Sequence, residues 1–186
     1  MPSSSIDHAF TARNAKGRSG DPTYAGALSF MRRKYSKNVA GADAVVWGIP
    51  FDAAVTNRPG ARFGPQAIRR ASAIFDCDPQ YPFQRDLFDD LAVIDYGDCL
   101  LDTGNHQKTP ATIEREAAKI LKSGAFLLTL GGDHFVTWPV LKAHAAIHGP
   151  MALVQFDAHQ DTWPDDGKRI DHGSFVARAV KDGIID

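Results

Sequence analysis

The sequence predicts an α/β fold, a three-layer α/β/α arrangement around a mostly parallel sheet. Two observations predict it. Short apolar, β-rich runs alternate with segments of helical character along the 186-residue chain. Two of these runs, residues 125–130 and 151–156, are joined by a helical segment. A strand–helix–strand unit of this kind makes the sheet parallel and its crossover right-handed.

The first 40 residues differ from the rest of the chain. Residues 1–40 are polar and basic, and we expect a solvated N-terminal arm with a short helix near residues 25–35. The alternating pattern fills residues 41–186, which we predict to be the N-terminal portion of one α/β domain. The chain begins without the basic and apolar regions of a secretory signal, and it lacks a bilayer-spanning apolar stretch. We therefore expect a cytoplasmic protein.

The first elements of the domain have clear boundary residues. Residues 44–49 are β-rich, and Pro50 ends this strand because proline cannot donate to a sheet ladder. A helix over 66–74 follows Pro65, whose fixed φ suits the first helical turn. A second strand is predicted at 91–95.

The next helix is the most regular of the chain. Thr109 is predicted to cap it, and the glycine at 124 to end it. Its apolar residues recur at helical spacing on one face. They are Ile113, Ala117, Ile120 and Leu121.

Buried strands and short helices follow. The run 125–130 reads as a fully buried strand, and a helix near 139–147 leads to the apolar strand 151–156. A polar loop over 157–173 precedes a short helix near 175–181, and another strand begins at 184–185.

Charge and cysteine content exclude several classes of function. The net charge is −1 and the pI about 6.6, so neither nucleic acid nor an anionic membrane is an expected partner. Cys77 and Cys99 are too few for a disulfide framework and match no zinc spacing. We interpret both as buried thiols in a reducing compartment.

Metal-binding side chains follow two of the predicted strands. His134 comes after the strand 125–130, and Asp157, His159 and Asp161 follow the strand 151–156. Ligands gather at the carboxyl ends of parallel strands, and in an extended backbone residues at period two project to one side. Gly131 and Gly132 let the backbone approach closely and bring the His134 imidazole round.

This set of ligands indicates a hydrolytic metal site. Imidazole and carboxylate ligands without cysteine select a hard or borderline divalent ion such as manganese or zinc. Several carboxylates suit two ions, which lower the pKa of a shared water so that it attacks at neutral pH.

The chain resembles the ureohydrolases, the family of arginase and agmatinase. The resemblance covers residues 40–186 and looks strongest to bacterial agmatinase. Its motifs lie at residues 48–52, 58–65, 131–134, 157–161 and 171–174.

The resemblance implies a ligand set and a reaction. His134 would bind one manganese ion and His159 the other, Asp157 would bridge them, and Asp161 would join the first ion. Asp161 and His172 would handle protons while a metal-bridging hydroxide attacks the guanidino carbon. Agmatine would yield urea and putrescine. Guanidinobutyrase, arginase and formimidoylglutamase activities stay open, because the loops that read the substrate tail are weakly diagnostic; deacetylases share a related fold but a different zinc motif.

Family members are longer than this chain and form homo-oligomers. Their second half supplies an Asp-x-Asp pair that completes both metal shells, so the 186-residue chain resembles an incomplete arginase-like domain. Alone it is expected to bind manganese weakly and to hydrolyse nothing measurable. An alternative from another class is a non-catalytic binding or regulatory subunit that associates with a complete homologue.

Four other groups of residues are interpreted as structural. The loop residues from Trp163 to Asp166 could line a substrate channel, but a solvated loop is favoured. His144 and His148 are interpreted as a pair at a helix end, without a third metal ligand nearby. Turn and packing roles are predicted for the other two groups. The turn and packing residues are Asp52, Arg58, Arg62, Asp95 and Asp98.

Overall fold

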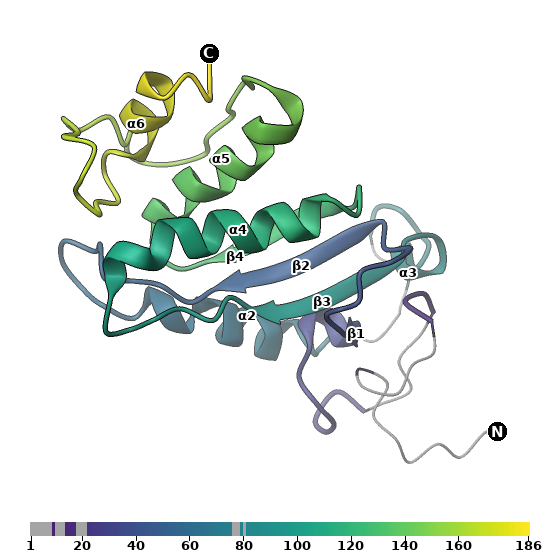
Figure 1. Ribbon diagram of the computed structural model, residues 1–186. Coiled ribbons are helices and arrows are strands. Elements are labelled where there is room, and N and C mark those ends of the chain that lie inside the picture. Colours follow the sequence, from purple (N-terminus) through teal and green to yellow (C-terminus); the bar gives the residue numbers. More distant parts are fainter. Residues whose placement is uncertain (1–8, 10–13, 18–21, 76–78, 80) are drawn as a thin grey trace. The chain divides into compact units, whose positions relative to one another are not determined.

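The structure is a computed structural model that describes residues 9, 14–17, 22–75, 79 and 81–186. The chain forms two compact units, each with its own architecture (Figure 1). The first comprises the described residues up to 48 together with 65–98 and 122–130. The second comprises residues 49–64, 99–121 and 131–186.

A sheet forms the centre of the first unit. Its strand order is β1-β3-β2-β4, and β3 pairs in parallel with both β1 and β2. The α/β class with a parallel sheet is thus confirmed. Val46, Phe88, Val93 and Leu130 form its apolar core. The elements are β1 (Lys34–Tyr35), β2 (Ala44–Ile49), α2 (Gly64–Ser72), α3 (Leu87–Asp90), β3 (Val93–Asp98) and β4 (Phe126–Gly131).

The N-terminal helix predicted near residues 25–35 is absent from the structure. The segment holds a single 3₁₀ turn, η1 (Phe30–Arg32), followed by β1. Met31 and Arg32 have φ of 46° and 56°, which a right-handed helix does not allow. Arg32 and Arg33 are buried, so this part of the arm is not solvated. The boundary at residue 40 stays a prediction.

Asp95 has the turn role predicted for it, because its Oδ1 accepts the N–H of Gly97 at 2.9 Å, and both Asp95 and Asp98 also form ion pairs. Arg69 on α2 donates from Nε and Nη2 to the two oxygens of Asp95, at 2.7 and 2.9 Å. Its Nη1 lies 2.6 Å from Asp98 Oδ1. Asp95 is fully buried and also accepts the N–H of Phe30 at 2.7 Å. A guanidinium therefore fixes α2 against β3.

Two predicted buried strands are less covered than expected. β4 ends the strand order, and Phe126 and Leu128 on it are exposed. Residues 152–156 form no strand, and Val154 and Phe156 are exposed. The predicted strand at 151–156 is reduced to a single parallel bridge from Met151 to Ile185, and within the described residues 152–156 pair with no strand.

The second unit is built from helices and loops. α4 packs on α5, where Lys142 Nζ lies 2.8 Å from Glu114 Oε2, and α5 packs on α6 (Figure 1). The predicted helix 175–181 is confirmed. The elements are η2 (Ala61–Phe63), η3 (His106–Lys108), α4 (Thr109–Leu121), η4 (His134–Val136), α5 (Thr137–His148) and α6 (Phe175–Lys181).

Helix α4 has the apolar face that its sequence predicted. Ile113, Ala117 and Ile120 are all buried. Thr109, however, does not cap the helix: η3 runs directly into α4, and the buried Thr109 hydroxyl finds no hydrogen-bond partner in the described structure. The last turn of η3 thus replaces a side-chain cap.

The C-terminal residues close a small core in the second unit. Ala179, Ile184 and Ile185 pack together, and Met151 forms a parallel bridge with Ile185. Cys99 is buried as predicted, whereas Cys77 and the first eight residues lie outside the described part of the chain. None of the described helices has both the length and the apolarity that a bilayer crossing requires.

Candidate metal centre

A sharp turn delivers His134 to the site. Gly132 has φ of 43°, and a Cβ placed there would lie 2.5 Å from the carbonyl oxygen of Ile49 and 2.6 Å from that of Phe51. Only glycine can make this approach, as its position in the motif predicted. The His134 ring then packs on the buried Phe175 ring of α6, with centroids 4.3 Å apart.

Asp133 anchors the same turn, a role that the sequence reasoning missed. Its carboxylate accepts the N–H of Ala54 at 2.9 Å and that of Phe135 at 3.0 Å, and its own N–H donates to Phe51 at 2.7 Å. Burial raises the pKa of the Asp133 carboxyl. An aspartate directly before a short helix is a capping signal that could have identified it.

Three of the predicted ligands meet. His134 Nδ1 lies 3.0 Å from Asp157 Oδ2 and 2.7 Å from Asp161 Oδ2. The three ligand atoms lie within 4.8 Å of one another, close enough to bind one ion. Asp161 has φ of 50°, so the loop curls and does not continue the extended backbone that the sequence predicted.

His159 does not join this group of three. Its side chain is 83% exposed, and its Nδ1 lies 3.5 Å from Asp157 Oδ1. The backbone N–H of His159 donates to the same oxygen at 2.8 Å and lowers the pKa of Asp157. The residue therefore touches the site from the solvent side, and curling of the loop is what separates it from Asp161.

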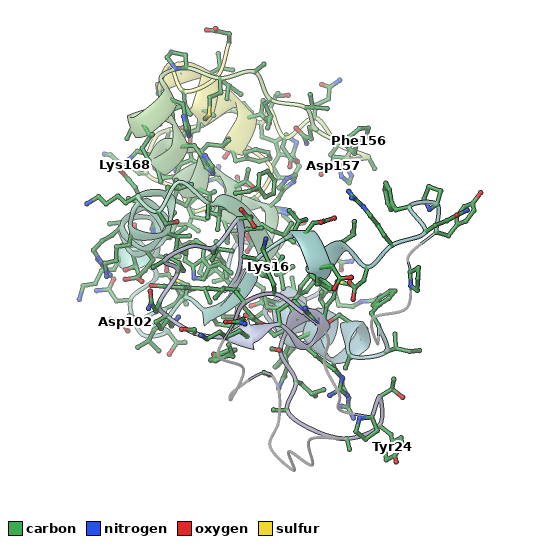
Figure 2. All side chains as sticks on the ribbon, turned by 90° about the vertical axis from the view of Figure 1, so that its right-hand side faces the viewer. Lys16, Tyr24, Asp102, Phe156, Asp157 and Lys168 are labelled. Carbon is green, nitrogen blue, oxygen red and sulfur yellow. The ribbon has the colours of Figure 1, made fainter. Side chains whose placement is uncertain are left out.

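The three predicted ligands lie in the wall of an open pocket of about 700 Å³. His172 shares this pocket, and its buried Nε2 finds no hydrogen-bond partner among the described residues. In Figure 2, Asp157 follows Phe156, which is 97% exposed. The pocket is lined by Thr56, His134, residues 157–163, His172 and Gly173.

Several hydrogen bonds connect α6 to the loop that precedes it. The prediction of a solvated loop was therefore wrong for Asp165. Arg178 on α6 binds the Asp165 carboxylate and donates to the Arg169 carbonyl at 2.6 Å. Val176 N–H donates to the Asp161 carbonyl at 3.1 Å. The ligand loop therefore packs as part of the α6 region.

The donor set fits a divalent cation. One imidazole and two carboxylates without sulfur suit a hard or borderline ion. His144 and His148 stack on α5 with ring centroids 5.9 Å apart, and they stand outside the group of three.

Comparison with known proteins identifies the family. An agmatinase of Chromobacterium violaceum is 52% identical over 97% of this chain and 56% of its own length. The crystal structure of a hypothetical agmatinase from Burkholderia thailandensis superposes with a TM-score of 0.94, at 50% identity over 97% of this chain and 57% of that one. Proclavaminate amidino hydrolase from Streptomyces clavuligerus gives a TM-score of 0.81 at 37% identity, over 89% of this chain and 55% of that one.

The chain spans about half the length of the relatives it matches, since it covers 56% and 57% of the two agmatinases. The family model described as "Arginase family" matches residues 42–186. These boundaries nearly coincide with the segment whose motifs carried the resemblance in the sequence. The chain belongs to the arginase family.

Proposed function

We propose that this pocket is the metal centre of a manganese-dependent, agmatinase-like ureohydrolase. One observation carries the proposal: His134 Nδ1 lies within hydrogen-bonding distance of both Asp157 and Asp161, at 3.0 and 2.7 Å. His134 and Asp157 belong to motifs that are distant in sequence, and binding of a shared cation would explain why they converge. Membership of the arginase family and the similarity to agmatinases support this assignment.

Each side chain has a proposed role. His134 and Asp161 would hold one manganese ion, and Asp157 would be shared with a second. His159, beside Asp157 Oδ1, is the proposed ligand of that second ion. His172 contributes a buried Nε2 in the same pocket, suited to pass a proton to a leaving group.

The chemistry follows from the guanidino group. The ions supply Lewis acidity that activates water and polarises the substrate. Its central carbon resists neutral water because the cation is stabilised by resonance. The amine leaves only after it is protonated, and Asp161 and His172 lie in the pocket to deliver that proton. With agmatine, the products are urea and putrescine.

The proposed activity concerns the protein to which this half-length segment corresponds. We propose that the 186-residue chain alone binds manganese weakly and releases no measurable urea, because three convergent side chains leave most positions of an octahedral ion to water. A mass-verified chain that released stoichiometric urea would contradict this. We likewise propose that this protein is homo-oligomeric and cytoplasmic, and that it acts on one of the guanidino substrates named above.

Manganese binding tests the site directly. The spectroscopic signal of free Mn²⁺ falls on binding, so titration followed by electron paramagnetic resonance gives an affinity for each variant. Asp161→Asn should weaken binding roughly tenfold or more, because it removes the charge nearest to His134. Asp166→Asn is the matched control, because Asp166 is exposed in the same loop and binds only the backbone N–H groups of Lys168 and Arg169. Equal affinity of wild type and Asp161→Asn would exclude the proposed centre.

A further inference from the structure

Trp163 lies in the wall of the same pocket, two positions after the ligand Asp161. The residue is 53% exposed, so part of its indole is open to a ligand in the pocket. The proposed function assigns it no role, and the following inference rests on that function.

The indole is held in a defined orientation. The backbone N–H of Trp163 donates to the Gly173 carbonyl at 2.9 Å and fixes the main chain that carries the ring. A Cβ at position 173 would lie 2.7 Å from Trp163 Cε3, so the ring packs directly on the glycine backbone. The ring also meets His172 edge to face, with centroids 6.1 Å apart at an angle of 89°. Because the ring is already held in place, little conformational entropy is lost when a ligand binds to its face.

The charge of the pocket wall indicates the sign of the ligand. The described lining contains Asp157 and Asp161 but no lysine or arginine. Asp165, which could have attracted a cation beside Trp163, is instead bound to Arg178. If metal ions neutralise the ligand carboxylates, the indole still attracts a cation through the negative face of its π system.

We propose that Trp163 is a substrate-binding residue whose indole face holds the guanidinium or ammonium group of a cationic substrate. This contact selects a cation over a neutral molecule of the same shape. It also places the positive charge of the substrate on the pocket wall next to His172 and the metal ligands.

Two probes of equal shape isolate the charge. Butylguanidine carries a guanidinium that is protonated at neutral pH, and butylurea replaces one of its nitrogens with oxygen and is neutral. Calorimetric titration of the 186-residue chain with each probe, with and without saturating Mn²⁺, gives the preference for the cation. Trp163→Leu should reduce that preference roughly twofold to thirtyfold, the range that cation–π attraction spans. Trp163→Phe should keep part of it, because phenylalanine retains a weaker π face.

Tyr24→Leu is the control for loss of an aromatic side chain, because Tyr24 is 90% exposed and is not among the residues that line the pocket. It should leave the preference unchanged. A Trp163→Leu chain with the wild-type preference, or a wild type that does not prefer the cation, would overturn the inference. Failure of the metal proposal shows separately, as absence of Mn²⁺ binding in the wild type.

Discussion

Arg178 on α6 donates a hydrogen bond from Nη2 to Asp165 Oδ1, and both side chains are buried, with 5% and 3% of their surface exposed. The guanidinium also lies 4.6 Å from the ring centroid of Trp138 on α5. Arg178 therefore connects three parts of the second unit: α6, α5 and the loop that follows Asp161. Its Nε finds no partner among the described residues, so the carboxylate and the Arg169 carbonyl carry its hydrogen bonding.

Arg178→Ala should lower the free energy of unfolding by about 3–5 kcal/mol, because it leaves the buried Asp165 carboxylate without its cation. Urea unfolding followed by circular dichroism measures this, and hydrogen exchange should show faster exchange in residues 163–173. Arg115→Ala, on the exposed side of α4, is the matched control and should change stability by less than about 0.5 kcal/mol. Equal stability of the two variants would mean that the Asp165 pair does not hold the loop.

Gly132→Ala should both destabilise the chain and weaken Mn²⁺ binding. The new Cβ would collide with the carbonyls of Ile49 and Phe51, in addition to the cost of a positive φ. Gly167→Ala is the matched control, because its φ is 76° and no atom lies within 4 Å of the added Cβ. We expect a loss of about 1–2 kcal/mol for Gly167→Ala and about 1–3 kcal/mol more for Gly132→Ala. If both variants bind Mn²⁺ as the wild type does, the turn does not position His134.

Arg69→Lys tests whether the geometry of the buried ion pair matters beyond its charge. Lysine cannot donate two parallel hydrogen bonds to Asp95 and also reach Asp98, so we expect a loss of roughly 3 kcal/mol. Arg70→Lys, exposed on the same helix, should have almost no effect. The free energies of unfolding of the two variants give the comparison. A small loss at position 69 would show that charge alone is sufficient there.

Asp52 should make stability depend on acid pH. Arg62 donates to its buried carboxylate at 2.6 Å, with further donors at Gly60 and the Arg62 backbone, and these bonds lower the pKa of Asp52. The pKa of Asp52 is lower in the folded chain than in the unfolded chain, where it is roughly 4. The ionised carboxylate therefore stabilises the fold at pH values above roughly 4, and this stabilisation is lost as the pH falls further. Asp52→Asn should therefore lose less stability than wild type between neutral pH and roughly pH 3.

Urea unfolding at a series of pH values checks this expectation. Asp89→Asn removes an exposed carboxylate and should follow the wild-type curve. Parallel curves for Asp52→Asn and wild type would show that the Arg62 bond persists in the unfolded chain or contributes nothing.

The sequence predicted most local boundaries because they depend on near neighbours. The strand at 44–49 and the helix at 175–181 were located to the residue, and the apolar face of α4 followed from helical spacing. It also identified the family and the residues that meet in the pocket. Gly132 was correctly predicted to allow a close backbone approach. These features are encoded by residue type and spacing within a few positions.

Tertiary structure decided which side chains meet and which are covered. His134, Asp157 and Asp161 converge because α6 supports the His134 ring and the loop curls at Asp161, whereas His159 stays exposed. The Asp165 side chain is buried against Arg178, and 152–156 form no strand because none of the residues that the structure describes pairs with them. Burial and pairing depend on residues distant in the chain, so the sequence could propose four convergent ligands but could not show that only three of them meet.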